Sequence, residues 1–126
     1  MKAFSDAVAD GDIESAIVLL DENVEFRSPA VHEPYQGKTA CATILRAVVE
    51  VLEDFRYVRK IGNEDGSDQA LVFTARVGDK ELEGCDFLHV NEDGLIDDFA
   101  VMIRPLSATV ALVEAMKAKL AEQARS

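Results

Sequence analysis

The chain has 126 residues, of which 24 are Asp or Glu and 13 are Lys or Arg, so its formal net charge at pH 7 is −11. This acidity argues against binding to nucleic acid or to an anionic membrane surface, because affinity for phosphate depends on clustered Lys and Arg. No apolar run reaches the roughly 20 residues of a membrane-spanning helix, and no secretory signal is visible. The two cysteines, Cys41 and Cys85, lie far apart in no metal-ligand spacing, which is typical of a cytoplasmic protein.

Apolar residues recur at helical spacing in three segments of the N-terminal half. The expected helices cover residues 4–11, 13–20 and about 39–52. Asp12 is expected to cap the second helix, because its carboxylate can accept hydrogen bonds from the first free amides. Alternating side chains predict a strand over residues 23–28, which an irregular loop follows as far as Gly37.

Four segments of the C-terminal half are rich in β-branched and aromatic residues and are separated by turn residues such as Asn63-Glu64-Asp65-Gly66. The expected antiparallel strands cover residues 55–61, 70–77, 82–90 and 95–103. A final helix is expected after Pro105. We therefore predict a single α+β domain over residues 1–126, with a core over 1–104 and a C-terminal helix within 105–126. A curved sheet wrapped around the N-terminal helices leaves a conical cavity, where small ligands bind.

Asp86 lies on the apolar face of the third of these strands. Because side chains of a strand alternate between its two faces, Asp86 shares its side with Leu82, Leu88 and Val90. Burial of a carboxyl group raises its pKa, and a protonated carboxyl can donate a hydrogen bond to a ligand carbonyl or an enolate oxygen. A purely structural role, in which Asp86 accepts hydrogen bonds from its neighbours, is an equal alternative.

Several short segments of the chain, taken together in their order and spacing, resemble those of a known protein family. They are residues 10–20 (DGDIESAIVLL), residues 24–29 followed by 33–37 (EPYQG), and residues 85–90 (CDFLHV) followed by 94–96 (GLI). Over residues 1 to about 104 the chain resembles the nuclear transport factor 2-like superfamily, on the branch that holds ketosteroid isomerases and SnoaL-like polyketide cyclases. The resemblance implies a cone-shaped, cystatin-like α+β roll.

The resemblance also places the three catalytic groups of a ketosteroid isomerase. The acid that donates to the oxyanion, which those isomerases keep neutral in an apolar site, falls on Asp86. The tyrosine of the oxyanion hole falls on Phe4, which has no hydroxyl, and the general base falls on Ser28, which is a poor proton acceptor. The resemblance therefore argues against steroid isomerisation by the family mechanism.

Three functions stay open from the sequence. The first is a binding domain for a small apolar or carbonyl-bearing molecule, with Asp86 as polar anchor and no cofactor or metal. The second is an isomerase, cyclase or hydratase in which Asp86 is the acid or oxyanion donor and His32 is the base, since an imidazole titrates near neutral pH. A solvated loop histidine is the alternative interpretation of His32. The third is a module whose only role is association.

The remaining assignments concern the ligand and the partner. We expect a homodimer through the sheet face that carries Phe87 and His89, because on this fold that face tends to meet a second subunit. The residues that we expect to contact the ligand are Phe4, Val8, Ser28, Tyr35, Leu88, Phe99, Val101 and Ile103. The final helix either caps the cone or extends the dimer contact.

Overall fold

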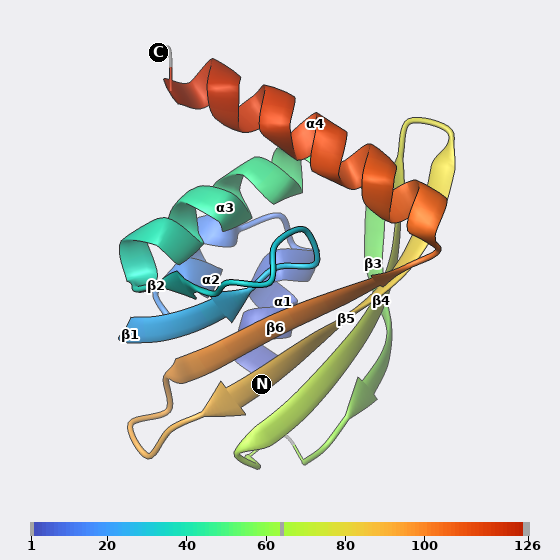
Figure 1. Ribbon diagram of the computed structural model, residues 1–126. Helices are drawn as coiled ribbons and strands as arrows, with labels where there is room; N and C mark the ends of the chain where they lie inside the picture. Colours follow the sequence, from blue (N-terminus) through green and yellow to red (C-terminus); the bar gives the residue numbers. More distant parts are fainter. Residues whose placement is uncertain (1, 64, 125–126) are drawn as a thin grey trace.

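A computed structural model describes residues 2–63 and 65–124 (Figure 1). Three positions named in the predictions lie outside the described residues: residues 1 and 126, which bound the predicted domain, and Glu64 of the predicted turn. The elements in chain order are α1 (Lys2–Ala9), α2 (Ile13–Ile17), β1 (Leu20–Arg27), β2 (Tyr35–Gln36), α3 (Lys38–Val51), β3 (Glu53–Ile61), β4 (Asp68–Val77), β5 (Lys80–Val90), β6 (Ile96–Arg104) and α4 (Leu106–Ala124).

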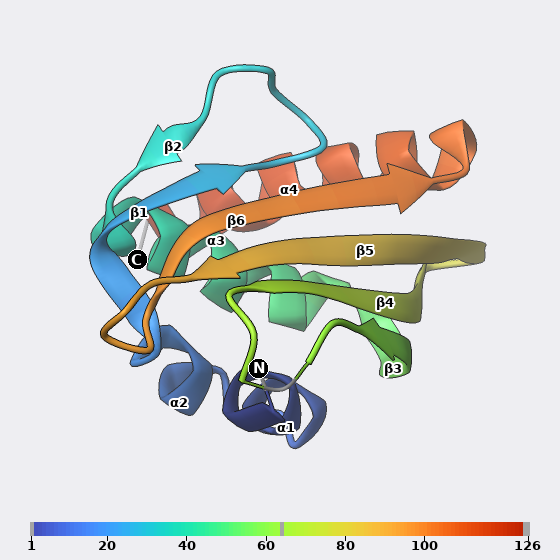
Figure 2. The ribbon, with the colours of Figure 1, turned by 90° about the horizontal axis from the view of Figure 1, so that it is seen from below.

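The strands form one curved, unclosed sheet in the order β2-β1-β6-β5-β4-β3. Strands β3 to β6 pair with their neighbours in antiparallel fashion, which confirms the predicted meander. Strand β1 pairs with β6 in parallel, and the short strand β2 pairs with β1. Figures 1 and 2 show that α3 and α4 lie on one side of this sheet. The predicted α+β architecture is confirmed.

Local sequence signals explain the start of α2. The carboxylate of Asp12 accepts a hydrogen bond from the Ser15 amide at 3.3 Å and another from the Ser15 hydroxyl at 2.6 Å. The first of these bonds satisfies an amide that the first helical turn leaves without a partner. The predicted N-cap is confirmed.

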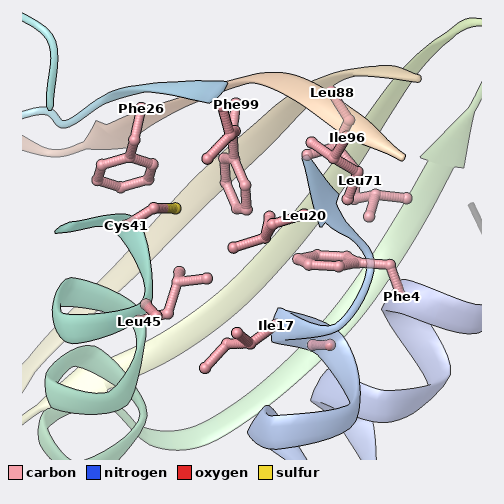
Figure 3. Close-up of a cluster of buried hydrophobic side chains, with 13 residues drawn as sticks. Phe4, Ile17, Leu20, Phe26, Cys41, Leu45, Leu71, Leu88, Ile96 and Phe99 are labelled. Carbon is pink, nitrogen blue, oxygen red and sulfur yellow. The ribbon is translucent and has the colours of Figure 1, made fainter. Parts of the chain in front are cut away.

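Three phenylalanines from distant parts of the chain join the helices to the sheet. Phe99 of β6 stacks edge-to-face with Phe4 of α1 and with Phe26 of β1, at ring-centroid distances of 5.6 and 5.3 Å. Figure 3 shows these rings among Leu20, Cys41 and other apolar side chains from β1 and α3. Full burial of each such side chain contributes about 1.5–3 kcal/mol, so this cluster stabilises the contact of α1 and β1 with β6.

Helix α4 follows Pro105 and crosses the concave side of the sheet next to α3 (Figure 1). The ammonium of Lys119 lies 3.1 Å from a carboxylate oxygen of Glu50 in α3, and the α4 side chains of Ala108 and Leu112 are buried. Within residues 2–63 and 65–124, no helix is both long and apolar enough to cross a membrane.

Candidate functional site

A cavity of about 540 Å³ lies between the sheet and the helices. Apolar side chains make up most of its wall, and the ionisable side chains in the wall are those of Tyr35, Tyr57, Asp86 and Lys117. Strands β3 to β6 line one side, while α3, α4 and residues 28–31 line the other sides. The wall residues are Val8, Ala9, Gly11, Ile13, Phe26, Ser28, Pro29, Ala30, Val31, Tyr35, Ile44, Leu45, Val48, Val49, Leu52, Phe55, Tyr57, Phe73, Asp86, Phe99, Val101, Ile103, Leu112, Val113, Met116, Lys117 and Leu120.

Asp86 lies in the middle of β5 on the side of the strand that faces the cavity. Burial alternates along β5, so Asp86 is only 7% exposed whereas its neighbour Phe87 is 42% exposed. Leu71 of β4 and Val101 of β6 are its partners on the adjacent strands. Strand alternation therefore places one carboxyl group within an apolar wall.

The environment of Asp86 favours the protonated form of its carboxyl group. Burial raises its pKa to about 7, because a charged carboxylate loses its hydration there. The Tyr57 hydroxyl donates a hydrogen bond to Oδ2 at 3.3 Å, which offsets part of the rise in pKa. Among the described residues, the other oxygen, Oδ1, has no hydrogen-bond partner. Asp86 thus has one oxygen left for a ligand.

Tyr57 of β3 is a site residue that the sequence reasoning missed. Burial and the neighbouring carboxyl of Asp86 raise the pKa of its hydroxyl, so Tyr57 remains a proton donor. Its ring packs edge-to-face on Phe55 and Phe73, at centroid distances of 5.0 and 6.5 Å. The available signal was a tyrosine two residues after Phe55, on the same face of a predicted strand.

The structure brings most of the expected ligand contacts together. Seven of the predicted residues line the cavity: Val8, Ser28, Tyr35, Asp86, Phe99, Val101 and Ile103. Phe4 and Leu88 belong to the apolar core in Figure 3 and are not among the residues of the cavity wall. His32 is exposed and is not among them either, although the preceding residues 28–31 are.

The hydroxyl of Ser28 shapes the loop at the rim of the cavity. Its oxygen accepts hydrogen bonds from the amides of Ala30 and Val31 at 3.2 and 3.3 Å. Tyr35 packs against Phe26 with a centroid distance of 6.3 Å and is 37% exposed. Both side chains are therefore engaged in local structure at the point where the cavity meets the surface.

The other candidate groups lie outside the cavity. His89 is exposed, and its Nδ1 lies 2.6 Å from a carboxylate oxygen of Asp97, which raises the pKa of His89. Cys41 is buried, and burial raises its pKa to about 12, so the thiol is unreactive at neutral pH. In the described part of the chain, no three His, Cys, Asp or Glu side chains converge as metal ligands do.

Comparisons with known proteins agree with this geometry. Residues 1–99 match the family model of the SnoaL-like domain. A structure described as a steroid delta-isomerase from Pseudomonas aeruginosa is 40% identical, with 96% of this chain and 88% of that chain covered and a TM-score of 0.91. An uncharacterized protein with a cystatin-like fold from Silicibacter pomeroyi is 37% identical, with 98% and 86% covered and a TM-score of 0.91.

A more distant structure shows the fold alone. It is an NTF2-like protein of unknown function from Cytophaga hutchinsonii, 20% identical, with 82% of this chain and 86% of that chain covered and a TM-score of 0.63. No curated protein matches the chain. The predicted resemblance is confirmed by the family model and by the two structures of higher identity.

Proposed function

Because the chain belongs to the SnoaL-like domain family, we propose that its cavity binds a largely apolar small molecule and that Asp86 holds an oxygen atom of that ligand. The observation that carries this proposal is a carboxyl group that is 7% exposed within an apolar cavity wall. Its raised pKa, about 7, keeps a proton on Asp86 in mildly acidic solution and leaves a large share of the molecules protonated at neutral pH. A protonated carboxyl donates a hydrogen bond to a carbonyl oxygen, which an ionised carboxylate cannot do.

A pair of naphthalene probes tests this proposal. We expect 2-acetylnaphthalene to bind about tenfold more tightly than 2-ethylnaphthalene at pH 6, because a hydrogen bond to a buried donor contributes about 1–1.5 kcal/mol. The preference for the ketone should disappear in Asp86→Leu and should fall as the pH rises above about 7, where Asp86 loses its proton. Fluorescence titration measures both affinities.

The hydrocarbon probe is the internal control in this experiment. Its affinity reports the apolar wall alone, so it should change little with pH. Equal affinities of wild-type protein for ketone and hydrocarbon at pH 6 would contradict the role of Asp86 as polar anchor. Failure of both probes to bind at any concentration up to their solubility would contradict the binding function itself.

A second candidate function is an enzyme of the isomerase, cyclase or hydratase type, with Asp86 as acid or oxyanion donor and His32 as base. The 40% identity to a protein described as a steroid delta-isomerase favours it. Two features oppose the family mechanism: Phe4 has no hydroxyl, and Ser28 already accepts two hydrogen bonds from its own loop. For His32 to act as base, its imidazole must turn inward from an exposed loop position.

A turnover assay separates catalysis from binding. We expect wild-type protein to convert a β,γ-unsaturated steroid ketone no faster than buffer. The reason is that the hydroxyl of Ser28, which stands at the position of the general base, is too weak a base to take a proton from the steroid. The ultraviolet absorbance of the conjugated product measures the rate. Turnover that is abolished by both Asp86→Asn and His32→Ala would replace binding with catalysis as the function.

We further propose that the protein works in the cytoplasm as a homodimer. Proteins of this family are often dimeric, and the face of the sheet that points away from the cavity carries the exposed apolar side chains of Phe87 and Met102. Exposed apolar side chains that lie close together on a surface are typical of protein interfaces. The free thiols of Cys41 and Cys85 support a reducing compartment.

A further inference from the structure

Helix α4 brings one cationic side chain to the cavity. Among the described residues of the cavity wall, Lys117 is the single cationic side chain and Asp86 is the single carboxylic acid. The family match ends at residue 99, so Lys117 lies beyond the part of the chain that the family model covers. The remainder of the wall contributed by α4 is apolar and consists of Leu112, Val113, Met116 and Leu120.

Lys117 has no ionic partner among the described residues. The neighbouring Lys119 forms an ion pair with Glu50 at 3.1 Å, and Lys38 lies 4.0 Å from Glu22. No ion pair or hydrogen bond joins Lys117 to Glu114, one turn earlier in the same helix, or to any other described residue. Within the described part of the chain, the ammonium group of Lys117 is therefore available to an anionic ligand.

The position of Lys117 combines an exposed side chain with a place in an apolar wall. A lysine has this combination when its methylene groups cover apolar surface and its ammonium group stays in water. The ammonium group of Lys117 therefore belongs to the rim of the cavity. Asp86 belongs to β5 of the sheet, whereas Lys117 belongs to α4, which crosses the concave side of that sheet in Figure 1.

A ligand that binds both Asp86 and Lys117 must carry polar groups at two separate points. One oxygen binds the carboxyl group of Asp86, whose other oxygen Tyr57 already engages; the middle of the ligand contacts the apolar wall, and an anionic group meets Lys117. We infer that the cavity is built for an amphipathic carboxylate, an apolar chain or ring system with a carbonyl or hydroxyl oxygen at one end and a carboxylate at the other. This inference rests on the proposed binding function and specifies its ligand class.

Methyl-ketone carboxylates of increasing chain length, with their methyl esters as neutral controls, test the inference. Each compound competes with 2-acetylnaphthalene for the wild-type protein at pH 6 and low ionic strength. At the best chain length, we expect the carboxylate to bind about twofold to fivefold more tightly than its ester, as for one solvent-accessible ion pair. Added salt should reduce this advantage, because it screens the ion pair.

Substitutions at Lys117 separate charge from packing. Lys117→Met keeps an apolar stem in the wall and should remove the advantage of the carboxylate while leaving the affinity of the ester unchanged. Lys117→Glu should make the ester the tighter ligand, and Lys117→Arg should retain the preference for the carboxylate. Lys80→Gln, at an exposed lysine that starts β5 outside the cavity wall, is the matched control and should change nothing.

The outcomes distinguish this inference from the proposed function. Carboxylates that bind no more tightly than their esters at every chain length would overturn the inference, while binding of the esters would still support the cavity as a ligand site. Equal weakening of carboxylate and ester binding by Lys117→Met would overturn the inference as well. Absence of binding by 2-acetylnaphthalene, by the esters and by the carboxylates would overturn both.

Discussion

The variant Asp86→Asn should be more stable than the wild-type protein at pH 8, although the substitution lies in the cavity wall. In the folded protein the pKa of Asp86 is raised from 3.8 to about 7 by burial. Between these two pH values the folded state holds a proton that the unfolded state has released. The wild-type free energy of unfolding therefore falls as the pH rises through this window, by about 1.4 kcal/mol per pH unit and by roughly 4 kcal/mol in total.

Asparagine has nearly the same shape as aspartate and does not titrate, so the difference between the two proteins isolates this one group. We expect the variant to gain stability relative to wild type from pH 5 to pH 8, as measured by urea unfolding at several pH values. Glu92→Gln, which removes an exposed acid in the turn before β6, is the control and should give a flat difference. A difference for Asp86→Asn that does not change with pH would show that Asp86 is already ionised at pH 5.

Gly84→Ala should destabilise the protein by about 1–3 kcal/mol, because it overpacks the wall next to the site. Gly84 lies two residues before Asp86 on β5, and a Cβ atom there would lie 2.8 Å from both Cε1 and Cε2 of Phe73. The Phe73 ring is buried against Phe55, at a centroid distance of 4.9 Å. The ring must therefore move, and the open space next to it is the cavity.

A double-mutant cycle identifies the clash as the cause. Phe73→Leu removes the outer part of the ring, so Gly84→Ala should cost at least about 1 kcal/mol less in that background than in wild type. In the single variant Gly84→Ala, the displaced ring should also weaken the binding of both naphthalene probes. Additive effects of the two substitutions on the free energy of unfolding would contradict this account.

Local periodicity accounts for what could be predicted of the site. Alternation along one strand was enough to place Asp86 on an inward face, and the Gly11-Asp12 break was enough to find the start of α2. Tyr57 could not be found in this way, because β4 separates it from Asp86. Their proximity depends on the pairing of Tyr57 with Phe73 and of Leu71 with Asp86, and strand alternation does not determine such registers.

Local sequence patterns also fail to predict those parts of the fold that depend on contacts between distant residues. Strand β2 has two residues, too few for a periodic pattern, and it exists because Phe26 and Tyr35 pair across the loop that Ser28 shapes. The core position of Phe4 follows from its edge-to-face contact with Phe99 of β6, a contact between residues far apart in the sequence. Contacts of this kind depend on the tertiary arrangement rather than on neighbouring residues.

The parallel pairing of β1 with β6 has a consequence for how the protein folds during synthesis. Phe26 pairs with Phe99, so β1 leaves the ribosome long before the strand that completes its hydrogen bonding. Pairing between strands so distant in sequence slows folding and leaves unpaired edges exposed in the meantime. In the described chain β6 follows all the other strands, so the sheet joins its two halves only after its other strands have been made. The nascent chain is therefore most prone to aggregation between the emergence of β1 and that of β6.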